Sequence, residues 1–318
     1  MSRVLVTGGA GFIGSHLVDQ LIEKGNQVVI FDNLSSGKLE FLQSALSSGN
    51  ATFVEGDLLN LESLNKVMKN IDIVYHLAAN PDIRLGTRVT DTDLKQGTFA
   101  TYNVLESMRI NGCNKIAFAS SSVVYGEAKL MPTPEDYGPL FPISLYGASK
   151  LGSEGLISAW VGTFGFKAWI FRFANIIGSR GTHGVIFDFI HKLKKDASNL
   201  EVLGNGLQEK SYMEVVDCSK AMIHVVERFN DDLNYVNLGS LDTCSVTRIA
   251  EIVIERSGFG DVNIHFTGGD RGWAGDVPKA MLDPTKLNVS GFKCDYQSED
   301  AVRLTADILI QEIGLLED

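Results

Sequence analysis

MSRVLVTGGAGFIG, residues 1–14, is the stretch that decides the fold of this chain. Val4-Leu5-Val6 is a short apolar run typical of a buried parallel strand. Residues 15–24 read as an amphipathic helix, and the turn before them is spaced by Gly8, Gly11 and Gly14. This order lets backbone N–H groups approach a pyrophosphate at the positive end of the helix. The stretch therefore predicts a dinucleotide-binding unit.

A second apolar run, residues 28–31, ends on Asp32. A carboxylate at this point of a dinucleotide fold accepts hydrogen bonds from the adenosine ribose. It also repels a 2′-phosphate, so Asp32 predicts NAD rather than NADP as the cofactor.

Composition limits the class of protein. The chain has 318 residues, 44% of them hydrophobic, and its net charge of −11 disfavours a nucleic-acid or anionic-membrane surface. No apolar stretch reaches the roughly 18 residues of a transmembrane helix. The four cysteines and six histidines are dispersed, so we expect no disulfide framework and no protein-bound metal. Without a signal peptide at its start, the chain is expected in the cytoplasm.

Buried-strand and helix patterns alternate through the first half of the chain. Such alternation predicts an α/β fold with a Rossmann-type doubly wound parallel sheet. Further strands are expected at residues 52–55, 71–76 and 115–119, with helices near 61–68 and 98–110. Prolines concentrate in residues 131–143, which predicts a loop there.

Beyond about residue 175 the pattern is less regular and glycine-rich turns accumulate. We therefore expect residues 1–174 to form the NAD-binding Rossmann domain. Residues 175–318 are expected to form mainly a smaller α/β lobe that binds the substrate, with some segments returning to the first domain.

Tyr146 and Lys150 lie four residues apart, near the start of a helix expected from Ser144 to Phe164. At this spacing both side chains lie on one face of the helix. A phenol has a reference pKa of about 10 and is a weak base at neutral pH. A neighbouring ammonium, together with an oxidised nicotinamide ring, favours the phenolate, which makes this pair a candidate acid–base group.

Ser120, Ser121 and Ser122 follow the strand expected at residues 115–119. Ligands of a doubly wound sheet bind at the carboxyl ends of its strands, so these hydroxyls are expected near the ligand. A hydroxyl there can relay a proton between a sugar oxygen and Tyr146. Serines at a strand end are also ordinary turn residues, and only one of the three need be catalytic.

These motifs together resemble the extended short-chain dehydrogenase/reductase family, and within it the NAD-dependent nucleotide-sugar epimerases, above all those acting on UDP-glucose. The resemblance covers nearly the whole chain. Besides residues 7–14 and 146–150, it is carried by residues 32–34, 56–58, 76–79, 120–126, 171–175 and 211–217. It implies an isomerase that epimerises C4 of UDP-glucose and UDP-galactose through a 4-keto sugar, with NAD bound throughout.

The resemblance also implies roles for single residues. Tyr146 would be the general base, Lys150 would hold the nicotinamide ribose and lower the pKa of Tyr146, and Ser121 would bridge substrate and base. The other implied cofactor-binding residues are Gly8, Gly11, Phe12, Ile13, Gly14, Asp32, Asn33, Asp57, Leu58, Leu77, Ala78 and Ala79. The implied substrate-binding residues are Ser121, Ser122, Tyr146, Asn175, Lys210, Arg271, Asp276 and Ala280.

Three positions depart from the family pattern. Gln96-Gly97 stands where the family has an asparagine, which leaves one cofactor hydrogen bond missing or replaced. Lys210 replaces an arginine and can neutralise a phosphate only as a point charge. The family's Arg-x-Gly-Asp is stretched here to residues 271–276, from which Arg271 is expected to reach the diphosphate.

Other activities of the family stay open. Ala280 stands where some relatives carry a bulky tyrosine, which favours UDP-N-acetylglucosamine as a further substrate. UDP-glucuronate is another alternative, because its epimerases have a similar serine-rich motif. A dehydratase or decarboxylase is disfavoured, since Ser122 and Val123 offer no acidic group for a second proton transfer. A non-catalytic nucleotide-sensing regulator is less favoured, because the Tyr/Lys pair is intact.

The helices expected near 98–110 and 147–164 carry apolar residues on more than one face. These residues are Tyr102, Val104, Leu105, Met108, Leu151, Leu156, Ile157 and Trp160. The family pairs both helices with their copies in a four-helix bundle, so the resemblance implies a homodimer. The alternative is that both helices are simply buried on the sheet. The expected partners are a UDP-sugar and a second copy of the chain.

Overall fold

The computed structural model describes residues 1–273 and 275–316, which form two compact units. Unit 1 consists of residues 1–126, 138–173 and 219–236. Unit 2 consists of residues 127–137, 174–218 and 237–318. Each unit has an apolar core of its own, so each stabilises its own set of functional side chains.

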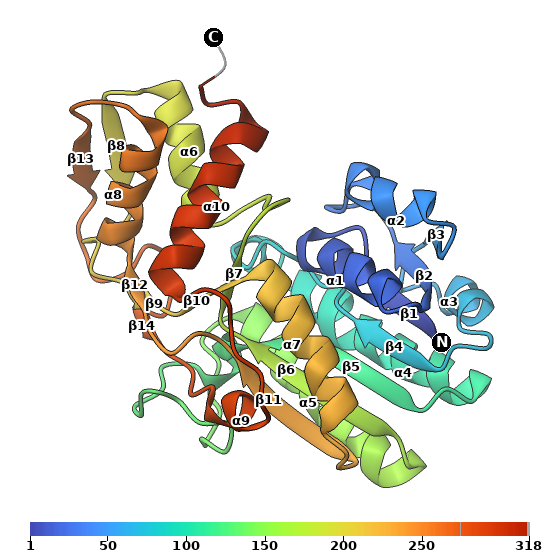
Figure 1. Ribbon diagram of the computed structural model, residues 1–318. Helices are drawn as coiled ribbons and strands as arrows, with labels where there is room; N and C mark the ends of the chain where they lie inside the picture. The colour runs from blue at the N-terminus through green and yellow to red at the C-terminus, as the bar shows by residue number, and fades with distance from the viewer. Residues whose placement is uncertain (274, 317–318) are drawn as a thin grey trace. The chain divides into compact units, whose positions relative to one another are not determined.

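Unit 1 is built on a seven-stranded sheet with the strand order β11-β6-β5-β4-β1-β2-β3 (Figure 1). Its strands are β1 (Arg3–Thr7), β2 (Gln27–Asp32), β3 (Ala51–Glu55), β4 (Ile73–His76), β5 (Lys115–Ser121), β6 (Lys167–Phe173) and β11 (Leu233–Leu238). Neighbouring strands are parallel in every pair from β6 to β3 in this order. The predicted doubly wound α/β sheet is confirmed, and its strands end together at one edge.

The helices of unit 1 follow the strands. They are α1 (Phe12–Glu23), α2 (Gln43–Ser47), α3 (Leu61–Val67), α4 (Ala100–Asn111) and α5 (Leu145–Phe164), with the short turns η1 (Leu39–Leu42), η2 (Leu85–Thr87) and η4 (Ser122–Tyr125). Helix α7 (Val215–Arg228) contributes residues to both units. Ser144 caps α5 as predicted, because its Oγ accepts a hydrogen bond from the Gly147 amide at 3.0 Å.

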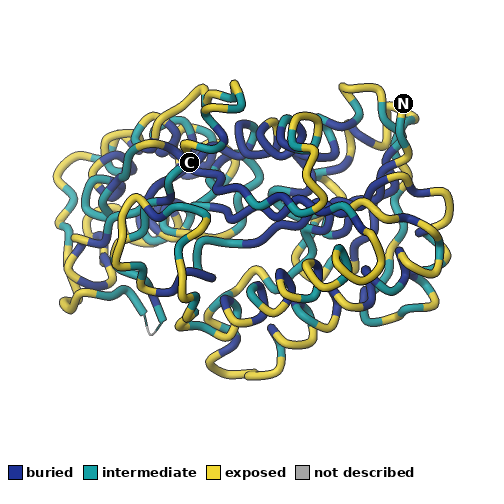
Figure 2. Tube along the Cα trace, turned by 90° about the horizontal axis from the view of Figure 1, so that it is seen from below, coloured by how far each residue is buried: buried dark blue, intermediate teal, exposed yellow. Residues whose placement is uncertain are grey.

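The sheet of unit 1 is buried between helices, which explains why its strands read as apolar runs. Leu5, Phe31 and Phe118 share one core with residues of α3, α4 and α5. Side chains alternate along a strand, so Val4 and Val6 point to the opposite face, toward α1. Figure 2 shows the strands as a dark blue band and the helices with exposed outer sides.

Two segments of unit 1 differ from the sequence prediction. Helix α4 is entered through a π-helical turn, η3 (Leu94–Phe99), which packs on α5. A Cβ on Gly97 in this turn would lie 2.6 Å from Ser149 Oγ, so glycine permits the close packing. Strand β5 continues to Ser121, so Ser120 and Ser121 lie within the strand and not after it.

Unit 2 combines short sheets with a helical layer. Strand β7 (Asn175–Ile177) pairs with β10 (Tyr212–Glu214), β8 (Asn199–Val202) pairs with β13 (Asn263–Phe266), and β9 (Glu209–Lys210) lies between β12 (Cys244–Ser245) and β14 (Lys279–Ala280). Helices α6 (Val185–Lys195), α8 (Val246–Ser257) and α10 (Ser298–Ile313) enclose one apolar core, and α9 (Thr285–Val289) is a short addition. Residues 131–143 contain no helix, as predicted.

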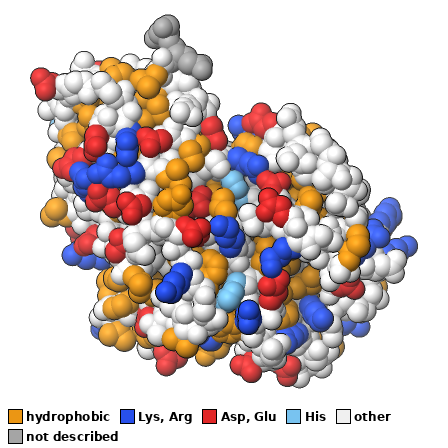
Figure 3. All heavy atoms as spheres, viewed as in Figure 1, with side chains coloured by type: hydrophobic (Ala, Val, Ile, Leu, Met, Phe, Trp, Pro, Cys, Tyr) orange, Lys and Arg blue, Asp and Glu red, His pale blue; other side chains and the backbone are white. Residues whose placement is uncertain are grey.

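Charged side chains of both signs are interspersed on the face shown in Figure 3. Within residues 1–273 and 275–316, no helix is both long enough and apolar enough to cross a membrane. The same residues contain no group of three or more His, Cys, Asp or Glu side chains arranged to hold a metal ion.

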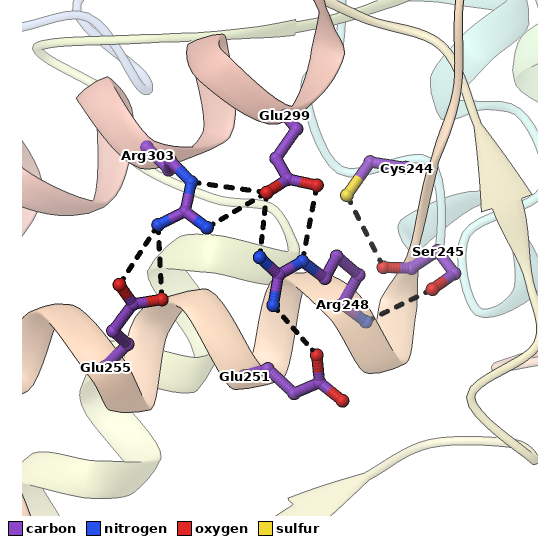
Figure 4. Close-up of polar contacts among 7 residues, drawn as sticks. All are labelled: Cys244, Ser245, Arg248, Glu251, Glu255, Glu299 and Arg303. Atoms are coloured by element: carbon purple, nitrogen blue, oxygen red, sulfur yellow. Dashed lines mark hydrogen bonds and ion pairs between the residues drawn. The ribbon is translucent and has the colours of Figure 1, made fainter.

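An ion-pair network joins the outer sides of α8 and α10 (Figure 4). Glu299 binds Arg248 at 2.8 Å and Arg303 at 2.9 Å. The two guanidinium groups extend the network to Glu251 and Glu255. Hydrogen bonds from both arginines lower the pKa of Glu299 to about 2.

Glu299→Gln should therefore reduce stability at pH 7 by roughly 0.5–1 kcal/mol, a small effect because water screens these half-exposed side chains. The pKa of Glu299 is depressed in the folded state. Its contribution is thus complete above the unfolded value of about 4.3 and is lost as the pH falls toward about 2. Urea unfolding at pH 7 and pH 3 measures the difference. Glu62→Gln, which removes an isolated exposed pair with Lys66, is the control and should change little. An undiminished difference at pH 3 contradicts the prediction.

Candidate active site

The glycine turn of unit 1 brings three backbone segments together. Gly8 has a φ of +70°, and a Cβ on it would lie 2.6 Å from the Ala78 amide nitrogen. A Cβ on Gly14 would lie 2.1 Å from the Gly8 carbonyl oxygen. Gly11 precedes α1, and within the described part of the chain no side chain caps the helix N-terminus, which begins with Phe12 and Ile13. Its amides are therefore available to an anion such as a pyrophosphate.

Asp32 ends β2 beside this turn and is 9% exposed. Its Oδ2 accepts a hydrogen bond from the Ala10 amide at 3.0 Å, and its Oδ1 accepts one from the Leu34 amide at 2.8 Å. These bonds fix the carboxylate against the glycine turn, where the sequence predicts the ribose-binding acid. Asn33 is exposed, and its Oδ1 accepts a hydrogen bond from the Ser35 amide at 3.0 Å.

The remaining predicted cofactor residues follow β3 and β4, and they are Asp57, Leu58, Leu77, Ala78 and Ala79. The Asp57 carboxylate accepts a hydrogen bond from the Leu59 amide at 2.8 Å. The Leu58 carbonyl accepts one from Asn103 Nδ2 at 2.8 Å, and the Leu77 amide donates to the Thr7 carbonyl at 3.1 Å. All five therefore lie at the carboxyl edge of the sheet, where a doubly wound fold binds its ligand.

Tyr146 and Lys150 lie on one face of α5, as predicted. Lys150 is 3% exposed, and its Nζ donates a hydrogen bond to the Ala119 carbonyl in β5 at 2.6 Å. The ammonium lies 5.5 Å from the centre of the Tyr146 ring and 4.9 Å from that of Phe118. The structure thus holds the ammonium between the end of β5 and the phenol.

Burial and one carboxylate act against a Tyr146 phenolate in this pair. Burial raises the pKa of Tyr146, and the carboxylate of Asp93 raises it further. Burial also lowers the pKa of Lys150 to about 8, against the opposing charges of Glu154 and Asp93. The sequence predicts a lowered phenol pKa when an oxidised nicotinamide ring acts together with the ammonium. The chain's own residues raise the pKa, so a phenolate needs the positive charge of a ligand as well.

The structure separates the three serines. Ser120 is buried and donates a hydrogen bond to Glu154 at 2.5 Å, so its hydroxyl is already committed. Ser121 is half-buried at the end of β5, and its Oγ accepts a 3.5 Å hydrogen bond from the Val123 amide. That bond leaves the Ser121 hydrogen available as a donor. Ser122 begins η4 and is also half-buried.

A buried ion pair that was not predicted from the sequence supports these groups. Arg172 of β6 binds Glu154 of α5 at 2.7 Å, and both side chains are 8% exposed. Arg172 also donates to the Tyr125 hydroxyl at 3.0 Å. The pair therefore ties the end of η4 to β6 and to the helix that carries Lys150, one turn before Glu154.

The predicted substrate residues of unit 2 gather around β9. Ala280 of β14 is paired in register with Lys210 of β9. Lys210 Nζ forms a 2.6 Å ion pair with Asp276, whose other carboxylate oxygen accepts a hydrogen bond from the Gly272 amide at 3.1 Å. Asp276 is 6% exposed, so it holds Lys210 and the loop at 271–276 together.

Arg271 and Asn175 complete this group. Arg271 donates to the Asp276 carbonyl at 2.7 Å and forms an ion pair with Glu127. Asn175 Nδ2 donates to the carbonyl of Ser211, which follows β9, at 3.1 Å. Lys210 and Arg271, both predicted to bind a diphosphate, are thus already paired with carboxylates. Glu127 was not among the residues predicted from the sequence.

The chain as a whole is similar to known proteins in sequence and in structure. Residues 4–239 match the family described as the NAD dependent epimerase/dehydratase family. A Methanocaldococcus jannaschii protein provisionally named UDP-glucose 4-epimerase is 33% identical, over 94% of this chain and 96% of that protein. A solved UDP-galactose 4-epimerase is 40% identical with a TM-score of 0.88, over 98% of this chain and 99% of that one.

Another solved structure, the UDP-glucuronic acid 4-epimerase from Bacillus cereus with UDP-glucuronic acid and NAD, is 26% identical with a TM-score of 0.88. The match covers 98% of this chain and 99% of the Bacillus cereus chain. The residues of unit 1 fit NAD, because a Cβ would fill the turn at Gly8 and Gly14 and the Asp32 carboxylate is fixed beside it. The chain therefore belongs to the NAD-dependent epimerase/dehydratase family.

Proposed function

We propose that this enzyme epimerises C4 of a UDP-sugar, with UDP-glucose and UDP-galactose as its main pair. The observation that carries the proposal is the buried Lys150 ammonium, held by the Ala119 carbonyl beside the Tyr146 ring. A tyrosine with a fixed neighbouring cation is an acid–base group, and Ser121 with a free hydroxyl hydrogen lies at the end of the adjoining strand.

Each side chain then has a defined task. Tyr146 accepts the proton of the sugar 4-hydroxyl and later returns it. Ser121 donates a hydrogen bond to the same sugar oxygen and orients it. Lys150 keeps its positive charge near the phenol throughout. Bound NAD supplies the hydride acceptor and donor, and Gly8, Gly14 and Asp32 would hold its ADP half.

We assign the diphosphate of the substrate to Lys210, Arg271 and Asn175 in unit 2. Both cations are paired with carboxylates in the structure, Lys210 with Asp276 and Arg271 with Glu127. A diphosphate therefore has to compete with these carboxylates, or share the cations with them. Binding mainly through the nucleotide end leaves the sugar free to present either face, as a 4-epimerase requires.

Dehydration and decarboxylation are less well supported. Both need a second acid–base group beside the serine, and Ser122 and Val123 of η4 offer none. Epimerisation of UDP-glucuronate needs no such group and is the alternative activity.

The proposal is tested by adding UDP-galactose to the purified protein and following UDP-glucose by proton NMR. We expect conversion in both directions to one equilibrium mixture, without added reductant. Absence of turnover with every UDP-hexose tested would exclude the proposed activity and favour a regulator of the same fold.

The half-buried Ala280 leads to a prediction about substrate range. It lies beside Lys210, and no large side chain stands at its position. We expect the wild type to convert UDP-N-acetylglucosamine as well as UDP-glucose. Ala280→Tyr should lower kcat/KM for the N-acetyl sugar by about tenfold, which corresponds to an overpacking cost of about 1.4 kcal/mol, and should spare UDP-glucose. Ala280→Ser is the control. Equal losses for both sugars contradict this interpretation.

An aromatic ridge on η3, α4 and α5 supports a homodimer. Phe99, Tyr102 and Phe164 are 52%, 38% and 47% exposed, and Trp160 links Tyr102 to Phe164 at ring distances of 6.0 and 5.4 Å. Several apolar residues expected on this surface are instead buried in the core of unit 1, namely Val104, Leu105, Met108 and Ile157. The surface offered to a second copy is therefore the ridge itself.

Light scattering at micromolar concentration should give twice the chain mass of 34.6 kDa. Tyr102→Asp should shift the protein toward monomers, because it places a charge in the centre of the apolar contact. Leu207→Asp, at a 68% exposed position of unit 2, is the control and should leave the mass unchanged. A wild-type monomer would contradict the pairing.

A further inference from the structure

Ser121 lies at the start of a segment that has little regular structure of its own. The segment is the single turn η4, which follows β5 and ends before Gly126, whose φ is +62°. Ser121 Oγ accepts a 3.5 Å hydrogen bond from the Val123 amide, and the Val123 carbonyl accepts one of 3.2 Å from the Gly126 amide. Turns of this type have poor hydrogen-bond geometry, so the place of the Ser121 hydroxyl depends on contacts from outside the turn.

The buried ion pair of Glu154 and Arg172 contacts this segment at both ends. At its first end, Ser120 Oγ donates a hydrogen bond to Glu154 Oε1 at 2.5 Å. At its last end, Arg172 donates to the Tyr125 hydroxyl at 3.0 Å, and the guanidinium carbon lies 4.8 Å from the centre of the Tyr125 ring. Arg172 binds both carboxylate oxygens of Glu154, at 3.1 and 2.7 Å. Such a paired contact fixes orientation as well as distance, so both ends of segment 120–125 are tied to one unit.

The same pair fixes this segment against the helix that carries Tyr146. Lys150 and Glu154 lie one turn apart on α5, and they bind consecutive residues of β5. Lys150 donates to the carbonyl of the residue before Ser120 at 2.6 Å, and Glu154 accepts from Ser120 itself. Tyr146 lies one turn before Lys150, and Ser121 is the residue after Ser120. The position of the serine hydroxyl relative to the phenol therefore depends on these two contacts.

Stability alone does not account for the ion pair. Both side chains are 8% exposed, and burying two charges costs solvation free energy that an apolar pair of similar size would not lose. An apolar pair, however, could not form hydrogen bonds with the hydroxyls at the two ends of segment 120–125. What the two ions add is therefore a fixed geometry for that segment.

We propose that Glu154 and Arg172 are positioning residues for Ser121: by holding segment 120–125 at both ends, they keep the Ser121 hydroxyl directed at the sugar oxygen that Tyr146 deprotonates. This inference rests on the proposed function and adds to it two residues that act through Ser121. A displacement of about 1 Å in a reacting group costs up to about 10²-fold in rate, so a loosened segment should be visible in kcat.

The test removes the hydroxyl at each end and leaves the ion pair in place, because a variant of Glu154 or Arg172 would leave a buried charge unpaired and endanger folding. Ser120→Ala and Tyr125→Phe should each lower kcat for UDP-galactose by about tenfold. KM should change less than twofold, because the proposed site binds the substrate mainly through its nucleotide end. Initial-rate kinetics with UDP-galactose measures both constants.

Two buried residues of unit 1 provide matched controls. Ser153 is 0% exposed, and its Oγ donates to the Ser149 carbonyl of its own helix at 2.8 Å. Tyr75 of β4 is 3% exposed. Ser153→Ala and Tyr75→Phe delete the same hydroxyl groups from the core without touching segment 120–125. Both should keep kcat within twofold of the wild type.

Repeating the two changes in Ser121→Ala separates positioning from general damage. Once the positioned hydroxyl is absent, loosening its segment should lower kcat by less than a further twofold. A further tenfold loss in this background would overturn the inference. It is equally overturned if Ser120→Ala and Tyr125→Phe have wild-type kcat, or if Ser121→Ala itself does. In each of these cases the wild type still turns over UDP-galactose, so the proposed function stands.

If the wild type turns over no UDP-hexose, the proposed function fails, and amide hydrogen exchange decides whether the pair holds the segment. The amides of Val123 and Gly126 should then exchange at least tenfold faster in Ser120→Ala and in Tyr125→Phe than in the wild type. Unchanged exchange of both amides overturns the inference. If one of the two variants does not fold, the other decides by the same criteria.

Discussion

Tyr146→Phe should lower kcat for UDP-galactose by about 10²–10⁴-fold and leave binding of the UDP-sugar and retention of NAD nearly unchanged. The substitution removes only the hydroxyl, so the ring packing of Tyr146 against its surroundings is kept. Lys150 does not depend on that hydroxyl, because its Nζ is held by the Ala119 carbonyl. The defect is therefore expected in proton transfer alone.

The measurement is initial-rate kinetics with UDP-galactose, combined with calorimetric binding of UDP. Tyr296→Phe, at a 37% exposed position of unit 2, is the matched control and should have wild-type kinetics. Turnover of Tyr146→Phe within tenfold of the wild type would exclude Tyr146 as the acid–base group. Loss of UDP binding would instead indicate that the variant is misfolded.

The parts of the site that the sequence predicted are those fixed by local structure. The turn at Gly8 and Gly14 needs glycine for backbone reasons that any such strand–turn–helix shares. The position of Asp32 relative to the glycine turn follows from the lengths of α1 and β2. Tyr146 and Lys150 face the same way because an α-helix brings residues four apart onto one face. None of these depends on distant packing.

The parts that the sequence did not predict depend on contacts between distant segments. Asp93 reads as one of several polar residues before a helix, and only the packing of η3 on α5 buries it next to Tyr146. Glu127 lies 144 residues from its partner Arg271. The strand that was expected to end before Ser120 continues to Ser121, because β6 pairs with it over its full length.

The phenol pKa illustrates the same limit. The sequence places an ammonium near Tyr146 and predicts a lowered pKa once an oxidised nicotinamide ring is also present. In the chain alone, burial and Asp93 raise the pKa, and neither the depth of burial nor that carboxylate is visible in YGASK. Local spacing thus predicts the candidate acid–base pair, whereas its titration is decided by the tertiary structure.

Lys150→Met should lower kcat by about 10²–10³-fold, because it removes a fixed charge from a water-poor site. It should also weaken NAD retention, measured as nucleotide released on gel filtration.

The same substitution should stabilise the folded chain, although it lowers the activity. The pKa of Lys150 is about 8 in the folded chain, against about 10.4 in an unfolded one. Burying this charge therefore costs up to about 3 kcal/mol at pH 7.

Methionine removes that cost. It also leaves the Ala119 carbonyl without its donor, which destabilises the variant by about 1 kcal/mol or more and so reduces the gain. We thus expect the variant to be about 1–2 kcal/mol more stable than the wild type at pH 7. Between pH 8 and 10.4 the unfolded chain binds more protons than the folded one, so wild-type stability rises relative to the variant. Urea unfolding at pH 7 and pH 10 should show the advantage shrinking. Lys95→Met, at an exposed position, is the control without this pH dependence. A pH-independent difference, or turnover within tenfold of the wild type, would contradict a buried catalytic ammonium.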